Sequence, residues 1–272
     1  MKNQPSLFFP RVRTKNHSSI GLRDRNNGLK FHKCRAVVRL GSTTELSTVY
    51  PKSYNTRRIV EINSIEGVKN SRSKFLMKQK FDEANISHAK WQTLDELLEE
   101  NKLKYPIVLK RIFGYKGRGM HLINTKEELD NLLPSINNDD YIAEQFHTYV
   151  REYRLHCTKE GCFYTCRKML QADAADRWYR NDSNCVWILE NNPLFDKPSN
   201  FDQIEEQCIK ALEAVGLDIG AFDVKVQSAA KENPKFIIIE VNSAPAFGEI
   251  TLEKYKETIN SLIENKINNY DN

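Results

Sequence analysis

The sequence predicts a mixed α+β fold, in which short apolar strands alternate with capped helices. Two Thr-x-x-Glu capping boxes, Thr93–Glu96 and Thr125–Glu128, each mark the start of a helix. Apolar residues recur at helical spacing over 201–215, which predicts a helix with one buried face. The predicted strands outnumber those that a helical bundle allows, so the class is α+β.

The predicted elements follow one another in order along the chain. Residues 1–35 lack sustained periodicity, and two short strands are expected after them, at 34–40 and 58–62. Ser71 or Ser73 can cap a helix that runs to about Ala84. The later expected elements are strands at 86–91, 105–110, 120–123, 141–146, 219–226 and 236–241, a hairpin at 151–170, and helices at 93–100, 125–133, 201–215 and 252–267.

Charge is distributed unevenly along the 272 residues. The formal net charge is +5, but residues 1–80 hold 18 Lys and Arg against four acids, whereas the remainder holds 23 against 32. Either the basic residues solvate an irregular N-terminal region, or they bind an anionic macromolecule such as nucleic acid or an acidic peptide. No apolar run of about 18 residues occurs, and the first ten residues lack a long apolar stretch. We therefore expect a cytoplasmic protein without a membrane partner.

Three of the six cysteines lie close together in the sequence, at Cys157, Cys162 and Cys166. Their spacing contains no Cys-x-x-Cys pair, and a structural zinc ion requires four nearby ligands. The stretch is typical of two strands joined by a turn at 159–161. Reduced thiols are therefore expected, with a metal site as the alternative.

A glycine-rich segment follows the predicted strand that ends at Lys110. Its glycines allow the backbone to turn and to point N–H groups at one spot, which suits phosphate oxygens. The segment lacks the Gly-Lys-Ser/Thr ending of a P-loop and does not open a helix, so neither a P-loop nor a Rossmann fingerprint is present. A plain hairpin turn is the alternative. The candidate phosphate-binding residues are Gly114, Lys116, Gly117, Arg118 and Gly119.

Carboxylates and an amide lie on the later strands. Glu240 and Asn242 are two residues apart on one strand, so their side chains share a face, and Asp223 lies on the neighbouring predicted strand. Such oxygen ligands suit Mg²⁺ beside nucleotide phosphates, although outward-facing polar residues on ordinary strands are the alternative. Earlier in the chain, Glu144 could accept from an adenine amino group and Glu152 could hold ribose hydroxyls.

Together, these features resemble the ATP-grasp superfamily over about residues 71–250, in the order Lys74, Lys110 with its loop, Glu144, Glu152, Asp223 and Glu240-x-Asn242. The resemblance implies two α+β lobes, 71–146 and 147–272, with ATP between them, after a short basic N-terminal region at 1–70. It implies phosphate contacts from Lys74 and Lys110, beneath a closing loop. The adenine would contact Glu144, Gln145 and Phe146, and the ribose Glu152. Two Mg²⁺ ions, replaceable by Mn²⁺, would bind Asp223, Glu240 and Asn242.

Within the superfamily, the chain most resembles the branch that contains the ribosomal-protein glutamate ligases. Arg167-Lys168 on a predicted strand and the later run Trp178-Tyr179-Arg180-Asn181 carry this resemblance. It implies an ATP-dependent ligase that activates a carboxylate donor as an acyl phosphate and joins it to an amine acceptor. The implied catalytic residues are Arg167, Arg180 and Lys110, and the implied substrate-binding residues are Arg167, Lys168, Asn181 and Ser243.

Three alternatives accompany this interpretation. Arg167 and Lys168 could be strand cations that are salt-bridged to acidic residues. The scaffold could carry a phosphotransferase, which would release ADP without an amine. The chain could also be a nucleic-acid or acidic-protein binding module that uses ATP only structurally, with residues 1–80 as its working surface.

Overall fold

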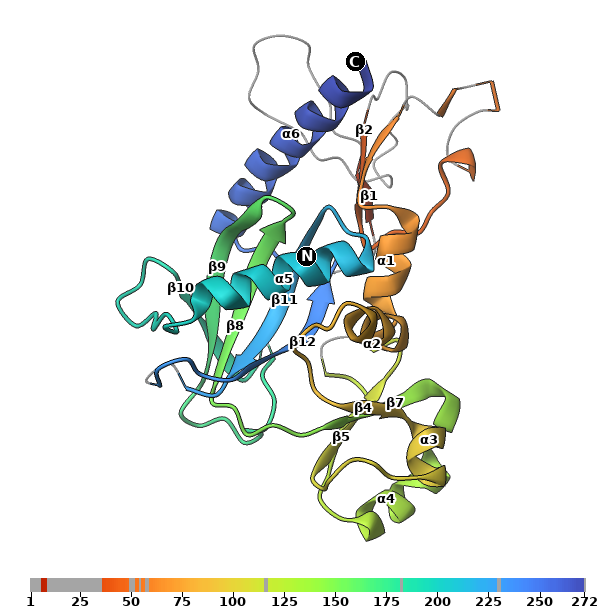
Figure 1. The fold of residues 1–272 in the computed structure, drawn as a ribbon, viewed down its shortest axis with the longest axis vertical. Coiled ribbons are helices and arrows are strands. Elements are labelled where there is room, and N and C mark those ends of the chain that lie inside the picture. The colour runs from red at the N-terminus through yellow and green to blue at the C-terminus, as the bar shows by residue number, and fades with distance from the viewer. Residues whose placement is uncertain are drawn as a thin grey trace.

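Three β-sheets and their flanking helices make up the described part of the chain (Figure 1). The computed structural model describes residues 6–8, 36–48, 52–53, 55–56, 59–114, 117–181, 183–228 and 231–271. The first sheet has the order β1-β2-β3, with β1 and β2 antiparallel and β2 and β3 parallel. Its strands are β1 (Ser6–Phe8), β2 (Ala36–Leu40) and β3 (Val60–Ile62).

The second sheet has four strands in the order β4-β7-β5-β6, all paired antiparallel. Two short helices cover it, and their capping threonines are the predicted ones. Thr93 accepts from the N–H of Glu96 in a complete capping box, whereas the carboxylate of Glu128 accepts from the N–H of Asn124. The elements are β4 (Trp91–Thr93), α3 (Leu94–Glu99), β5 (Ile107–Arg111), β6 (Met120–Ile123), α4 (Lys126–Leu132) and β7 (Tyr141–Gln145), with short 3₁₀ turns at Leu133–Ser135 and Asn138–Asp140.

The third sheet has five antiparallel strands in the order β10-β9-β8-β11-β12. Helix α5 lies across β8 and β11 (Figure 1) and buries Ile204, Cys208 and Leu212 against them. Gly216 ends this helix in the left-handed conformation, with φ of 81°. The elements are β8 (Arg151–Thr158), β9 (Gly161–Leu170), β10 (Cys185–Leu189), α5 (Phe201–Val215), β11 (Ile219–Val226) and β12 (Phe236–Asn242).

Helix α2 (Lys74–Glu83) matches the helix that the sequence predicts after Ser73, whereas α1 (Ile65–Arg72), just before it, was not predicted. Ser73 ends α1 and caps α2, because its side chain accepts from the N–H of Leu76. Val68, Met77 and Phe81 pack into the core of the five-stranded sheet. Helix α1 also comes close to the end of α5, and a Cβ placed on Gly67 would lie 2.1 Å from the carbonyl oxygen of Gly216.

The last helix, α6 (Glu249–Asp271), connects the end of the chain to the first sheet (Figure 1). Tyr255, Ile259 and Ile263 are buried on its inner face and pack with Val38 and Ile62. Because α6 begins just after β12, it joins the five-stranded sheet to the N-terminal sheet. The helix extends beyond the predicted range 252–267 at both ends.

Several predictions differ from the structure. Residues 86–90 are not a strand, since they cross from α2 to the second sheet and His88 makes only an isolated bridge to Ile238. Strand β10 is not among the strands that the sequence predicts. The expectation of reduced thiols is wrong for Cys157 and Cys162, which form a disulfide because the hairpin register places them opposite each other.

None of the helices in the described ranges is long and apolar enough to cross a membrane. The expected anionic partner of the basic N-terminal region falls on residues of which most, including 9–35, lie outside the described ranges. That expectation therefore stays a prediction.

Candidate active site

A cavity of about 850 Å³ lies between the four-stranded and the five-stranded sheets. Of the described residues that line it, nine are Lys or Arg and only four are Asp or Glu. An excess of positive charge in a concave site attracts anions. The charged lining residues are Arg72, Lys74, Lys110, Arg111, Arg118, Arg154, Lys168, Arg180, Lys225, Glu144, Glu152, Asp223 and Glu240.

Most of the residues predicted from the sequence lie in the wall of this cavity. Gly119 belongs to the same loop but does not line it, and Lys116 lies outside the described residues. The predicted residues that line it are Lys74, Lys110, Gly114, Gly117, Arg118, Glu144, Gln145, Phe146, Glu152, Lys168, Arg180, Asn181, Asp223, Glu240, Asn242 and Ser243.

A buried charge cluster forms the wall on the side of the second sheet. Lys110 Nζ, on β5, donates to Glu144 Oε2, on β7, over 2.8 Å. Lys78 Nζ, from α2, lies 3.4 Å from the other carboxylate oxygen. Burial alone would raise the pKa of Glu144, but the two ammonium groups outweigh it and lower this pKa to about 2. Burial lowers the pKa of Lys78 to about 8.

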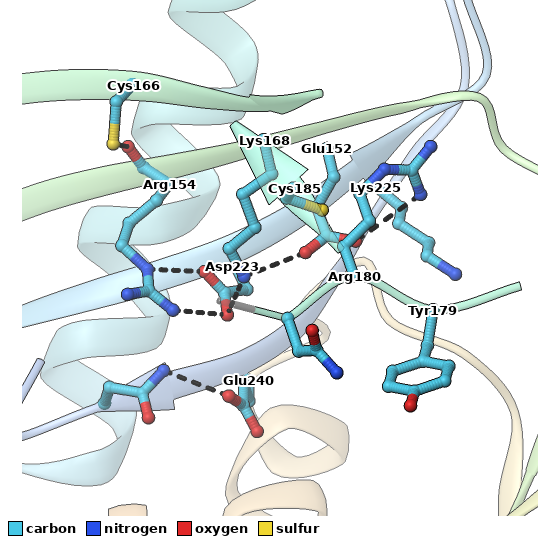
Figure 2. A network of polar contacts seen from close by, with 12 residues as sticks. Glu152, Arg154, Cys166, Lys168, Tyr179, Arg180, Cys185, Asp223, Lys225 and Glu240 are labelled. Atoms are coloured by element: carbon cyan, nitrogen blue, oxygen red, sulfur yellow. Dashed lines mark hydrogen bonds and ion pairs between the residues drawn. The ribbon is translucent and has the colours of Figure 1, made fainter. Parts of the chain in front are cut away.

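A second charge network covers the inner face of the five-stranded sheet (Figure 2). Arg154 donates to both oxygens of Asp223, with Nε–Oδ1 and Nη2–Oδ2 distances of 2.7 and 2.8 Å. Lys168 Nζ bridges two carboxylates, at 2.8 Å from Asp223 Oδ2 and 2.9 Å from Glu152 Oε1. Burial would raise the pKa of Asp223, but the adjacent Arg154 and Lys168 lower it well below its usual range. The Trp187 ring lies over Arg154, 4.9 Å from its Cζ, and limits its movement.

The predicted metal ligands lie together but differ in availability. Asp223 and Glu240 are directly opposite each other on β11 and β12. Asn242 donates to Glu240 Oε1 over 3.1 Å, and Glu240 Oε2 is 3.9 Å from Lys74 Nζ. Glu240 and Asn242 thus offer hard oxygen ligands that fit Mg²⁺. Asp223 does not fit in this arrangement, because Arg154 and Lys168 occupy both its oxygens.

The glycine loop contacts two different parts of the cavity wall. Lys74 Nζ, at the start of α2, donates to the carbonyl oxygen of Gly114 over 2.9 Å. Gly117 has φ of 74°, and a Cβ there would lie 3.2 Å from the ring of Tyr179. The loop therefore packs against the segment between β9 and β10, which covers the cavity from the other side.

Arg167, which was predicted to be a catalytic and substrate-binding residue, lies outside the wall of the cavity. Neighbouring residues on a strand face opposite sides, and Lys168 faces the cavity opposite Glu152. Arg167 is paired with Tyr153 on the outer face, where its Nη1 donates to Asp196 and to the carbonyl oxygen of Leu194. Its expected contact with a substrate in this cavity is therefore wrong, and it matches the salt-bridged alternative.

Two predicted substrate contacts line the cavity and also support its shape. Asn181 Oδ1 accepts from the N–H groups of Ser183 and Asn184, at 2.8 and 3.0 Å, which forms the turn before β10. Ser243 lies just beyond β12 and accepts from the Ser71 hydroxyl over 3.0 Å.

Sequence reasoning missed several charged residues of the site, and Arg154, Lys225 and Lys78 have the closest links to its charge clusters. Arg154 follows Glu152 by two residues on β8, and Lys225 follows Asp223 by two residues on β11. Strand alternation alone would have placed both on the inner face. Lys78 follows Lys74 by one helical turn on α2, and its buried position depends on how that helix packs.

No family model matches the sequence, and no curated protein matches it. The structure is similar to a carboxyaminoimidazole ribonucleotide synthase from Aspergillus clavatus complexed with ATP, with a TM-score of 0.63 and 19% identity over 85% of this chain and 60% of that one. It is also similar to a D-alanine–D-alanine ligase from Bacillus anthracis complexed with ATP, with a TM-score of 0.55 and 15% identity over 74% of this chain and 68% of that one.

A third similar structure is an N5-carboxyaminoimidazole synthetase from Staphylococcus aureus complexed with ADP, with a TM-score of 0.55 and 18% identity over 72% of this chain. The chain spans only 51% of that structure and 53% of a second synthase from Aspergillus clavatus. All of these identities are low, so the likeness concerns the fold. The fold of this chain is the ATP-grasp fold.

Proposed function

We propose that this chain is an ATP-dependent carboxylate–amine ligase that acts through an acyl phosphate. The observation that carries the proposal is the cationic cavity between the two lobes. It gathers Lys74, Lys110, Glu144, Glu152 and Glu240 from separate elements, in the order that the ATP-grasp resemblance implies. The similar structures complexed with ATP or ADP support a nucleotide in this cavity.

In this proposal, the lobes are residues 71–146 and 147–272. Helix α2 belongs to the first range, but it packs Met77 and Phe81 into the core of the five-stranded sheet and contributes Lys74 to the cavity. The phosphates lie between Lys74 and the glycine loop, and the base lies beside Glu144. Glu240 and Asn242 would hold Mg²⁺. When bound, this ion neutralises the charge of the transferring phosphoryl group.

The reaction has two balanced steps. An oxygen of the donor carboxylate attacks the γ-phosphorus of ATP, which forms the acyl phosphate and releases ADP. The acceptor amine then attacks the acyl carbon, loses a proton and displaces inorganic phosphate, which leaves an amide. Such chemistry depends mainly on positioning and charge stabilisation, which a preorganised cationic site provides.

Arg180 is the best placed residue to stabilise the oxyanion of the second step. Its Nε is buried and has no hydrogen-bond partner among the described residues, while Nη2 is held by the carbonyl oxygen of Val150. Loss of one such donor typically raises the barrier by about 3–4 kcal/mol. In this proposal, Lys168 rather than Arg167 faces the substrate, because Lys168 lines the cavity. Arg180, Asn181 and Lys168 also support a place in the branch of the ribosomal-protein glutamate ligases.

The proposal is tested by measuring ADP release from ATP with mixtures of carboxylates and amines, followed by mass spectrometry of the products. Glu240→Gln removes the charge of one proposed metal ligand and is expected to lower the rate at least tenfold. Glu264→Gln makes the same change at an exposed position of α6 and is expected to retain the wild-type rate.

The outcomes separate the candidate functions. Amide formation that requires ATP, carboxylate and amine together supports the ligase. ADP release that needs no amine and yields a phosphorylated product would instead identify a phosphotransferase. If the chain binds ATP but releases no ADP with any of these mixtures, the proposed ligase activity toward the tested carboxylates and amines is contradicted.

A further inference from the structure

Lys225 lines the cavity but has no part in the proposed chemistry. It lies on β11 two residues after Asp223, so its side chain faces the same side of the sheet. Its partners on the neighbouring strands are Glu152 on β8 and Ile237 on β12. A lysine therefore stands where the inner face of the third sheet meets the end of β7.

The ammonium group of Lys225 is poorly satisfied by the protein. Its Nζ lies 3.4 Å from the carbonyl oxygen of Trp178, which is a long contact, and 5.5 Å from the centre of the Phe146 ring. It forms no ion pair with any carboxylate of the described residues, and Figure 2 shows no contact between it and the residues drawn there. A half-buried cation that has no carboxylate partner and only one long hydrogen bond contributes little to stability, so stability does not explain this lysine.

Electrostatics lead to the same conclusion. Burial, together with the nearby Lys110 and Arg180, lowers the pKa of Lys225 to about 8 against the opposing effect of Glu152 and Glu144. The group is still largely protonated at neutral pH and carries donors that the protein leaves unused. A ligand that offers an acceptor there would relieve part of the cost of burial.

The surroundings of Lys225 have the character of a site for a planar base. Phe146 and Ile237 lie beside Lys225, and further apolar side chains line the same cavity. Ligand pockets combine apolar walls with a few polar groups that fix orientation. Glu144 Oε1 lies 3.4 Å from Lys78 Nζ and accepts no other hydrogen bond from the described residues, so this ionised carboxylate oxygen still has a lone pair for a further donor. The apolar lining residues are Met77, Ala89, Val108, Phe146, Ile237 and Ile239.

We propose that Lys225 is a specificity-determining residue that reads the nucleotide base. Its ammonium donates a hydrogen bond to a ring nitrogen of a purine, while Glu144 accepts from the exocyclic amino group on the same base. The pair presents one donor and one acceptor to the edge of the ring, which orients the base before the phosphates engage. This inference rests on the proposed function, because it requires ATP in this cavity.

The experiment compares ATP with 1-deaza-, 3-deaza- and 7-deaza-ATP, each of which lacks one ring nitrogen. Dissociation constants are measured by calorimetry for the wild-type chain, Lys225→Met, Lys225→Gln and the control Lys210→Met, which changes an exposed lysine on α5. The wild type is expected to bind one of the three analogues about tenfold more weakly than ATP. Lys225→Met is expected to bind ATP about tenfold more weakly and to bind that analogue as well as it binds ATP.

Loss of the discrimination in Lys225→Met, or in Lys225→Gln if the methionine variant does not fold, supports the proposal. Lys210→Met should retain it. Equal binding of ATP and all three analogues by the wild type would overturn the inference without any variant, as would unchanged discrimination in a folded Lys225 variant. If the wild type binds ATP but does not distinguish the analogues, only this inference fails. If it binds no ATP, the proposed function fails with it.

Discussion

The buried cluster of Lys78, Glu144 and Lys110 allows a stability prediction of known size. Glu144→Gln keeps the shape of the side chain but removes the only negative charge of the cluster. The Lys78 side chain is fully buried and that of Lys110 is 8% exposed. Two ammonium groups would then remain buried without their carboxylate, which is the situation in which breaking a buried ion pair is most costly.

Two estimates of the magnitude agree. Removing one partner of a buried pair typically costs about 3–5 kcal/mol. The pKa of Glu144 is lowered from 4.5 to about 2, and at about 1.4 kcal/mol per unit this corresponds to about 3 kcal/mol. For a chain of this size, a loss of about 3 kcal/mol lowers Tm by about 6–12 °C.

The same shift predicts a dependence on pH. Because the folded-state pKa of Glu144 is lowered, the folded chain binds fewer protons than the unfolded chain between about pH 4.5 and pH 2. The stabilisation is therefore complete above about pH 4.5 and is lost as the pH falls to about 2. The Glu144→Gln variant lacks this part of the acid transition.

Urea denaturation followed by circular dichroism at pH 7 measures the effect, with Glu83→Gln as the control. Glu83 is 62% exposed and pairs with Lys80 on the surface of α2, so its loss should cost less than about 0.5 kcal/mol. Adding Lys78→Met to Glu144→Gln should restore about 1 kcal/mol or more, because it removes an unpaired buried charge. A loss below 1 kcal/mol in Glu144→Gln, or no recovery in the double variant, would refute this reasoning.

Three further predictions follow from the packing and the site. Gly67→Ala should lower the free energy of unfolding in urea by about 1–3 kcal/mol, because its Cβ would lie 2.1 Å from the Gly216 oxygen; wild-type stability would contradict this contact. Arg167→Gln should keep the wild-type affinity for ATP in calorimetry, whereas Lys168→Gln should lower it, and equal losses would place Arg167 in the site after all. Burial, aided by Arg154, lowers the pKa of His156 to about 3. Between about pH 6.5 and pH 3 the unfolded chain therefore binds more protons than the folded chain, and the stability of the fold decreases as the pH is lowered through that range. His156→Gln should flatten this part of the pH–stability curve, and an unchanged slope would count against a buried neutral histidine.

Local patterns predicted much of the fold correctly. Helix 201–215 and the strands at 120–123 and 219–226 have the predicted bounds, because their signals, such as the apolar periodicity of the helix, lie in neighbouring residues. The Thr93 capping box is present as predicted for the same reason. Residues 86–90 misled the prediction, because a short connecting segment between two sheets resembles a strand until its partners are known.

The composition of the candidate site was also largely visible in the sequence, because residues on one strand face recur at every second position. Alternation alone could not show which of the two faces of a strand points into the cavity. Arg167 and Lys168 are adjacent, and only the pairing of β8 with β9 shows that Lys168 faces the cavity.

The sequence by itself determined most of the elements and which side chains on a strand share a face, since both depend on interactions a few residues apart. The tertiary structure alone decided which charges meet. Arg154 and Lys168 occupy Asp223, Lys78 lies behind Glu144, and Lys225 remains without a carboxylate partner among the described residues. These partnerships join residues as far apart as Arg154 and Asp223, and they depend on strand register and helix packing, which no local signal encodes.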